Sequence, residues 1–394
     1  MSAEADRAAP TTDHLAVAWD AAVATVRGNI ADFTAWYPDD TTTGGAYRPR
    51  SARDGQPEGA NVGWTTGFWP GMLWLAWEGT GDDAVLRAAR HQVDSFADRV
   101  TRGVDLDTHD LGFLYTLSCV TPWRLVGDER ARDAALAAAD HLMVRFLEPA
   151  GILQAWGDLT DPVQRGRTII DSLMNVPLLY WAAGTTGARA YRDAAIRHTE
   201  QLRRHILRPD GTTFHTFYWD VDTGEPLRGA TEQGHQDGSC WARGQAWGMY
   251  GFALGYRHVR EPSFLDAARR CADYFLTRLP ADRVAYWDLV FTDGSGQERD
   301  SSAAAIAVCG LYEIADHVDD QDVALRYRTE ADAILTSLAT TYSTAHDTTS
   351  TSLLRHGVYD MPKNVGVDEG NLWGDYFYLE ALSRRLRADW RSYW

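Results

Sequence analysis

Lysine is almost absent from this chain of 394 residues, and basic charge as a whole is scarce. The only lysine is Lys363, so nearly all of the 38 basic residues are arginines, and 55 acidic residues stand against them. The resulting net charge of −17 makes nucleic acids and anionic membrane surfaces poor partners. An anionic ligand would therefore need a local positive field at its own site.

Long apolar runs, paired cysteines and metal-binding motifs are also missing. No apolar run approaches the length of a membrane span. Residues 1–13 lack the basic and apolar regions of a secretory signal, and we interpret them as a disordered lead before a single domain over 14–394. The cysteines lie far apart, which favours free thiols in a cytoplasmic compartment. The histidines form no HExxH motif, so a zinc site has little support.

A two-helix unit recurs along the chain. Each copy begins with an aromatic-rich apolar segment, continues through a turn such as GTGD or GTTG, and ends in a segment rich in Ala and Arg. Five copies and a final half-copy cover residues 67–96, 110–143, 171–202, 243–276, 301–335 and 371–386. A further amphipathic segment, LAVAWDAAVATVRGNIADF, precedes the first copy. The pattern predicts about six helical pairs.

The two helices of each pair differ in their polarity. The first is apolar nearly all round, as a buried helix is, and the second carries charges on one face, as an outer helix does. Closing such pairs into a ring gives an all-α (α/α)6 barrel, and leaving them open gives a solenoid. The repeat spacing of roughly 45–70 residues, with long and uneven connections, favours the barrel.

Two aspartates stand at the starts of successive inner helices, Asp110 in THDLGFLY and Asp171 in IIDSLM. Aspartate is a favoured helix cap, so a purely structural role is the simpler interpretation of Asp110 alone. In a barrel, however, adjacent inner helices bring both side chains to one rim. Two carboxylates across a cavity are the arrangement that acid–base chemistry on a sugar requires.

The connecting segments are unusually aromatic, and the chain has 16 tryptophans. Because sugar faces stack on aromatic rings, this enrichment favours a carbohydrate pocket. Trp64 and Trp156 lie in loops and are candidates for stacking, although packing in the barrel interior would also explain them. Trp74 and Trp77 lie inside the first inner helix and are expected in the core.

The segment from 214 to 248, FHTFYWDVDTGEPLRGATEQGHQDGSCWARGQAWG, is the most informative. Its pattern predicts extended backbone, then turns, then a helix. Arg243 is the best candidate to clamp a carboxylate, since a guanidinium grips one with two parallel hydrogen bonds. His215 is either a hydrogen-bond donor or a packed imidazole.

Several motifs together resemble the unsaturated glucuronyl hydrolases of glycoside hydrolase family 88. They are WTTGFWPGMLWLAWEGTGD, HDLGFLY, IIDSLMNVPLLYWA, FHTFYWD, SCWARGQAWGMYG and WGDYFYLEAL, and they extend from about residue 60 to residue 386. The resemblance implies an (α/α)6 barrel without metal or organic cofactor. It also implies that the substrates are small oligosaccharides, left by polysaccharide lyases, that carry a 4,5-unsaturated uronic acid at the non-reducing end.

The resemblance also implies roles for individual residues. Asp171 would be the general acid and base, and Asp110 would be the second essential carboxylate. The pocket residues implied in the same way are His215, Gln233, Arg243 and Trp247 around the uronate and Trp64 and Trp156 as stacking aromatics. The implied reaction protonates C4 of the C4=C5 enol ether and adds water at C5, after which the hemiketal opens and expels the remaining sugar.

Other interpretations stay open at this point. The related unsaturated rhamnogalacturonyl hydrolases share the barrel, although the HDLGF and SCWARGQAWG segments favour the glucuronyl group. A sugar epimerase or a glycosidase acting on intact bonds would be another enzyme on the same barrel. A non-catalytic carbohydrate-binding protein would explain the tryptophans but not the pair Asp110 and Asp171. The sequence does not distinguish a monomer from a dimer.

Overall fold

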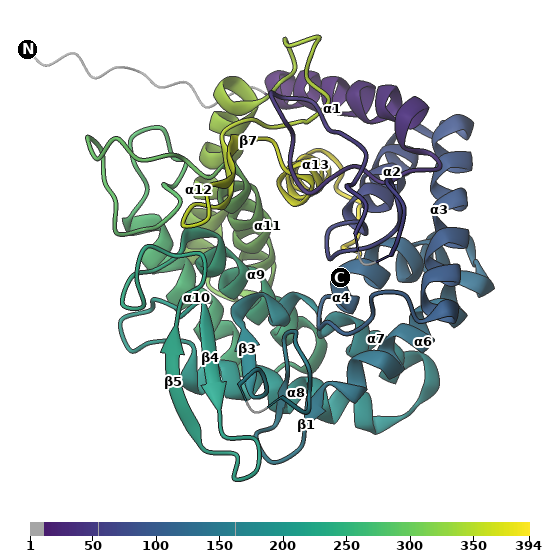
Figure 1. Ribbon diagram of the computed structural model, residues 1–394. Helices are drawn as coiled ribbons and strands as arrows, with labels where there is room; N and C mark the ends of the chain where they lie inside the picture. Colours follow the sequence, from purple (N-terminus) through teal and green to yellow (C-terminus); the bar gives the residue numbers. More distant parts are fainter. Residues whose placement is uncertain (1–11, 54, 162) are drawn as a thin grey trace, which may run out of the picture.

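Inner and outer helices alternate along the chain and around a ring (Figure 1). The structure is a computed structural model that describes residues 12–394 except residues 54 and 162. The inner layer consists of α2 (Phe68–Thr80), α4 (Leu111–Tyr115) continued by η1 (Thr116–Val120) and α5 (Thr121–Val126), α7 (Pro177–Thr186), α9 (Ala242–Val259), α11 (Ser301–His317) and α13 (Leu372–Leu386). The outer layer consists of α1 (Thr12–Phe33), α3 (Asp83–Arg102), α6 (Glu129–Val144), α8 (Arg189–His205), α10 (Pro262–Thr277) and α12 (Gln321–Ser337). Because α13 packs against both α1 and α2, the ring closes, and the predicted (α/α)6 barrel is confirmed.

Two of the turns between inner and outer helices are each explained by a Gly-Asp pair. Gly81 ends α2 and Gly127 ends α5 in the left-handed region, with φ of 69° at both positions. Glycine adopts this conformation without the steric penalty of a Cβ. The next residue then caps the outer helix, since Asp82 accepts a hydrogen bond from Ala84 N and Asp128 accepts one from Ala131 N. The Gly-Asp pairs therefore explain the tight hairpins after α2 and α5.

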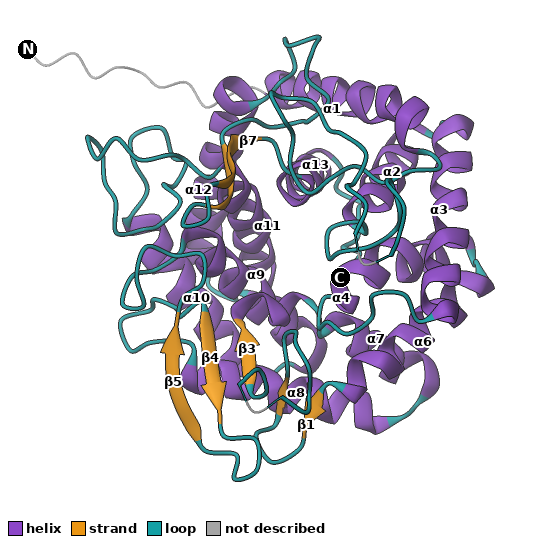
Figure 2. Cartoon of the chain, viewed as in Figure 1, coloured by secondary structure: helices purple, strands orange, loops and turns teal. Residues whose placement is uncertain are grey.

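Short antiparallel strands occupy the connecting segments and leave the barrel itself all-α (Figure 2). The largest sheet has the order β3 (Arg167–Ile169), β4 (Thr216–Trp219) and β5 (Pro226–Ala230). The two-stranded sheets pair β1 (Phe146–Leu147) with β2 (Ile152–Leu153) and β6 (Gly357–Asp360) with β7 (Val365–Glu369). The segment from 214 to 248 is thus extended, then turning, then helical, as its pattern predicts.

Aromatic side chains fill the barrel axis. Phe113 lies 5.2 Å from Trp247 and 5.9 Å from Trp394 between ring centroids. Trp394, the last residue, stacks on Phe377 at an interplanar angle of 10° and donates from its indole nitrogen to Glu380 Oε2 at 2.9 Å. The end of the chain therefore packs inside the ring, where Figure 1 marks the C-terminus. Trp74 is fully buried, as expected for a core residue, whereas Trp77 is only partly buried and packs against the core from outside.

The expected lead over residues 1–13 lies mostly outside the described residues, and α1 begins at Thr12. The four cysteines are all free and buried, in line with the absence of paired spacing. None of the helices in the described part of the chain combines the length and the apolar character needed to cross a bilayer.

The second and third inner segments meet at an unusually close contact. A Cβ built on Gly112 would lie 2.2 Å from Asn175 Cα, so that only glycine fits there. Asn175 fixes the same contact by hydrogen bonds, because its Oδ1 accepts from Phe113 N at 2.7 Å and its Nδ2 donates to Asp171 O at 3.4 Å. This contact brings the starts of the two segments together.

Replacing Gly112 by Ala should destabilise the protein, because the new methyl group would overlap backbone atoms that cannot rotate away. We expect a loss of about 1–3 kcal/mol in the free energy of unfolding, measured by urea denaturation. Gly28→Ala is the matched control, since Gly28 lies in α1 with no atom within 4 Å of the added Cβ. That change should be neutral or stabilise by up to about 1 kcal/mol. Equal effects of the two substitutions would contradict the close contact.

Candidate active site

One cavity of about 400 Å³ opens where the inner helices begin, and it collects every residue that the sequence predicts for the site. The eight predicted residues on its wall are Trp64, Asp110, Trp156, Asp171, His215, Gln233, Arg243 and Trp247. They come from segments up to 183 positions apart in the sequence, so the barrel alone brings them together.

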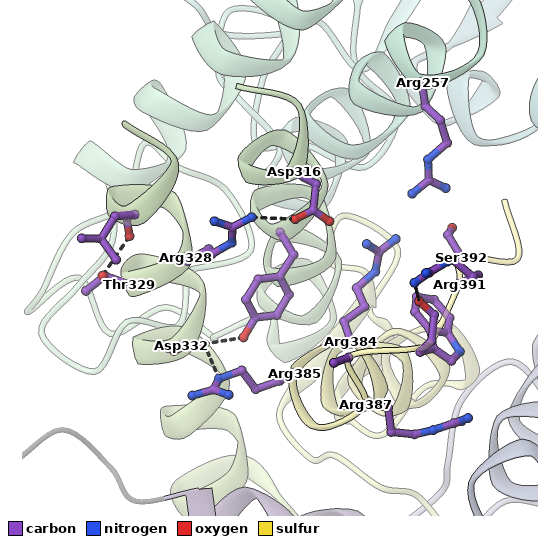
Figure 3. A pocket seen from close by; sticks show the side chains of 14 residues that line it. Arg257, Asp316, Arg328, Thr329, Asp332, Arg384, Arg385, Arg387, Arg391 and Ser392 are labelled. Atoms are coloured by element: carbon purple, nitrogen blue, oxygen red, sulfur yellow. Dashed lines mark hydrogen bonds and ion pairs between the residues drawn. The ribbon is translucent and has the colours of Figure 1, made fainter. Parts of the chain in front are cut away.

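A larger cavity of about 630 Å³ lies at the opposite ends of α9, α11 and α13, where these helices finish (Figure 3). Five of its six arginines pair with acids, as Arg328 does with Asp316 at 2.9 Å and Arg385 does with Asp332 at 3.0 Å. Positive side chains at helix C-termini also complement the helix dipoles. These pairs explain the arginines as structural, and the smaller cavity is the candidate site.

Asp110 is not a helix cap. It occupies the residue before α4, but its side chain makes no capping hydrogen bond. Thr108 Oγ1 instead donates to Asp110 Oδ2 at 2.7 Å. The backbone around it is held by a β-bridge between Thr108 and Trp156 and by a hydrogen bond from His109 N to Ala155 O at 2.7 Å. The side chain is thereby fixed toward the cavity, which favours the site role that the pairing with Asp171 predicts.

Asp171 lies in the 3-10 turn η2 (Ile170–Met174), six residues before α7 begins, and not at the helix start expected from the sequence. The turn follows directly from β3, and Ile170 N donates to His215 O at 3.0 Å. Strand pairing therefore sets Asp171 beside His215. Below the turn, Ser172 Oγ donates to Ile169 O at 2.6 Å and contacts His198 Nε2 at 2.7 Å.

The two carboxyl groups share one buried space. Burial raises the pKa of Asp110 to about 6, although hydrogen bonds from Thr108 and Asn175 act in the opposite direction. Burial also raises the pKa of Asp171 well above its ordinary value, and the charge of Asp110 raises it further. Asp171 is thus the carboxyl that keeps its proton, and Asp110 is the one that ionises first.

His109 completes this group, and the sequence analysis did not identify it. One nitrogen of His109 and one oxygen each of Asp110 and Asp171 lie within 4.8 Å of one another. Among the described residues these three are the one set of side chains that could hold a metal ion. Burial lowers the pKa of His109 to about 3, so the imidazole is neutral. Its position directly before Asp110 in the THD motif was the available signal.

His215 presents a hydrogen-bond donor to the cavity. Its Nδ1 accepts hydrogen bonds from Glu232 N at 3.0 Å and Gln233 N at 3.2 Å. The proton of the neutral ring must therefore sit on Nε2. Burial, with Arg243 and Lys363 nearby, lowers the pKa of His215 to about 3, and the ring stays neutral at physiological pH. It can donate to a ligand but cannot serve as a general acid.

Arg243 lies on the cavity wall but is already partly engaged. Its Nη1 pairs with Asp300 Oδ2 at 3.1 Å and contacts Val358 O, and its Nη2 donates to Tyr359 O at 2.7 Å. These contacts with described residues use three of the five N–H groups of a guanidinium. The side chain is 1% exposed. Removing Arg243 would therefore leave the buried Asp300 carboxylate without its cationic partner.

The aromatic residues occupy different depths. Trp247 is 1% exposed and packs on Phe113 and Phe377, so it forms the floor. Trp64 donates from its indole nitrogen to the hydroxyl of Tyr359 at 2.9 Å. Trp156 is 41% exposed at the rim, and the guanidinium of Arg167 covers its ring at 3.7 Å. Trp156 is therefore the most exposed of these three tryptophans.

Seven more residues line the cavity besides the eight predicted ones: His109, Ile169, Glu232, Trp241, Tyr359, Asp360 and Lys363. Glu232 immediately precedes the predicted Gln233, and Ile169 lies two residues before Asp171. Tyr359 lies on β6, 116 residues after Arg243. Nothing in the local pattern around Tyr359 indicates that it reaches the cavity, because a tertiary contact alone places it there.

Comparison with known proteins agrees with this geometry. The family model Glycosyl Hydrolase Family 88 matches residues 35–376. An unsaturated chondroitin disaccharide hydrolase from Streptococcus pyogenes is 46% identical over 378 residues, which are 96% of this chain and 92% of the relative. The crystal structure of an unsaturated glucuronyl hydrolase from Streptococcus agalactiae matches with a TM-score of 0.93 and 43% identity, over 99% of this chain and 96% of that one.

A variant of the Streptococcus agalactiae enzyme, complexed with dGlcA-GalNAc6S, matches with a TM-score of 0.84 and 40% identity, over 99% of this chain and 95% of that one. The extent of these matches confirms the resemblance that the sequence motifs indicate. The chain belongs to glycosyl hydrolase family 88, the family of the unsaturated glucuronyl hydrolases.

Proposed function

We propose that the protein removes 4,5-unsaturated glucuronic acid from the non-reducing end of oligosaccharides that polysaccharide lyases produce. The observation that carries this proposal is the pair of carboxyls, Asp110 and Asp171, that line one cavity beside His109, where burial and the charge of Asp110 raise the pKa of Asp171. A site of this kind supplies both an acid and a negative charge to one substrate.

In the proposed mechanism, protonated Asp171 donates its proton to C4 of the enol ether. Positive charge then develops at C5 and the ring oxygen, where ionised Asp110 stabilises it. Asp171, now a carboxylate, takes a proton from water as the water oxygen bonds to C5. The resulting hemiketal opens and releases the remaining sugar. The rule that relates carboxylate separation to inversion or retention does not apply, because one carboxyl serves as acid and base in turn.

The substrates best supported are unsaturated glycosaminoglycan disaccharides. The Streptococcus pyogenes relative is named for chondroitin disaccharides, and the Streptococcus agalactiae variant is complexed with dGlcA-GalNAc6S. In this chain, His215 Nε2 and Arg243 supply donors for the uronate, and Trp156 at the rim supplies a stacking surface for the leaving sugar. Cytoplasmic location and the choice between monomer and dimer stay predictions.

The decisive assay follows the ultraviolet absorbance of the C4=C5 double bond with an unsaturated chondroitin disaccharide. Loss of absorbance is the expected result, and no loss with chondroitin, hyaluronan or heparin disaccharides would refute the proposed function. Adding EDTA tests the set His109, Asp110 and Asp171 as a metal site, and we expect unchanged turnover. An unsaturated rhamnogalacturonyl disaccharide, assayed in the same way, tests for the activity of the related rhamnogalacturonyl hydrolases.

Asp171→Asn should abolish turnover while substrate still binds. The amide keeps the size of the carboxyl but cannot donate a proton to carbon. General acid–base catalysis contributes about 10²–10⁴-fold, and one residue supplies both halves here, so kcat should fall by at least that range. Steady-state kinetics and calorimetric binding of the disaccharide measure the two effects. If this variant kept near-normal turnover and Asp110→Asn were inactive, Asp110 would be the acid and base and Asp171 the second carboxylate.

Asp110→Asn should change the pH profile as well as the rate. In the wild type, activity should fall as the pH drops through about 6, because Asp110 becomes protonated there. The variant loses this acid limb. It also loses the charge that raises the pKa of Asp171, so Asp171 gives up its proton at lower pH and the basic limb moves down. Asp360→Asn is the control, a pocket carboxylate that pairs with Lys363 and should move neither limb.

Arg243→Lys tests the carboxylate clamp without stripping Asp300 of a positive partner. Lysine keeps the charge but loses the two-pronged geometry. We expect KM to rise by roughly 30-fold, equivalent to about 2 kcal/mol, with a smaller change in kcat. Asp300→Asn is the control, since it weakens the ion pair and leaves the guanidinium in place. An unchanged KM in a folded Arg243→Lys protein would remove Arg243 from substrate binding.

A further inference from the structure

His109 stands between the two carboxyls, and the proposed mechanism gives it no role. Its Nε2 lies 3.4 Å from Asp110 Oδ1 and 3.5 Å from Asp171 Oδ1. Two buried atoms of this group, His109 Nδ1 and Asp171 Oδ1, have no hydrogen-bond partner among the described residues. Buried polar atoms nearly always have a hydrogen-bond partner, so two unpartnered atoms in this small group require an explanation.

The unpartnered Nδ1 of His109 indicates which ring nitrogen carries the hydrogen. With the hydrogen on Nδ1, a buried donor would have no acceptor, and the Nε2 lone pair would face two carboxylate oxygens. A doubly protonated ring would also leave the Nδ1 hydrogen unsatisfied. With the hydrogen on Nε2, the unpartnered atom is a neutral acceptor and the donor points between the carboxyls. His109 is therefore a neutral Nε2–H donor.

Resting on the proposed function of this site, we propose that His109 is a positioning residue that shares its Nε2 hydrogen between the two carboxyls and transfers this hydrogen bond from Asp110 to Asp171 as Asp171 gives up its proton. At rest the acceptor is ionised Asp110. After proton transfer to C4, the new charge on Asp171 Oδ1 takes up the donor. The present distances are long for hydrogen bonds, as is common before a substrate is bound, and we expect them to shorten in the complex.

The charged and titratable groups around His109 come from several elements. Arg145, at the end of α6, acts on His109 and Asp110, and His198 of α8 lies on the other side. Asp105 acts on Asp110, and Arg243 acts on Asp171. The guanidinium of Arg145 donates hydrogen bonds to Gln154 O and Gly157 O. Among these groups, His109 is the one whose side-chain nitrogen lies within 3.5 Å of both carboxyls.

The test compares His109→Leu with His109→Gln by pH-dependent kinetics on the unsaturated chondroitin disaccharide. A donor stabilises the ionised form of a carboxyl, so its loss raises the pKa of both aspartates and moves both limbs of the profile to higher pH. For His109→Leu we expect a shift of about one pH unit and a fall in kcat of about 10- to 100-fold, with KM little changed. The glutamine amide reaches the same position and should restore the limbs and part of kcat.

The control is His258→Leu, far from the carboxyls. His258 Nε2 is also buried without a partner among the described residues, its pKa is likewise lowered to about 3, and its ring stacks on Tyr180 at 4.7 Å. This variant should lose stability without moving either limb. If His109→Leu does not fold, His109→Asn replaces it, because its shorter amide cannot reach both carboxyls.

Limbs that stay in place in the folded His109 variants would overturn the inference, even if kcat falls. Limbs that move equally in His109→Leu and His109→Gln would also overturn it, since the amide donor would then have no effect. The wild type separates this failure from that of the proposed function. An inactive wild type refutes the function, whereas an active wild type with unmoved limbs in the variants refutes only the role of His109.

Discussion

The contact between Gly112 and Asn175 is the constraint on which the catalytic arrangement depends. It brings the second and third inner segments so close that a single methyl group would overlap the backbone. Asn175 then bonds to Phe113 N on one side and to Asp171 O on the other, and it also helps to hold Asp110. Two carboxyls on separate elements influence each other's protonation strongly only when they lie close together, and this contact brings them close.

Burial is the main cause of the protonation states of the four central titratable groups. It is the largest cause of the raised pKa values of Asp110 and Asp171 and of the lowered pKa values of His109 and His215. The imidazoles are therefore neutral donors. Asp171, which feels the charge of Asp110 in addition, becomes the one proton source. Repulsion from the charge of Asp110 is the second cause of the raised pKa of Asp171, after burial.

The sequence predicts the barrel well because hydrophobic pattern and turn chemistry recur in every pair of helices. It also predicts residues that lie in motifs, such as Asp110, Asp171 and Arg243, which the barrel then brings together. Contacts made by distant segments are beyond such reasoning: the ion pair between Arg243 and Asp300, the contribution of Tyr359, and the 3-10 turn at Asp171. Each depends on the packing of connections whose own patterns are irregular.

The position of the site also explains how a chain of net charge −17 could bind an anionic sugar. The cavity lies where inner helices begin, and the N-terminal ends of helices carry partial positive charge. At the opposite rim the helices end, and the arginines there balance negative helix ends and acids (Figure 3). The overall charge acts through solvent and is screened by salt, whereas buried donors such as His215 Nε2 act at contact distance. The partial positive charge at the helix starts therefore favours an anion in this cavity despite the negative net charge.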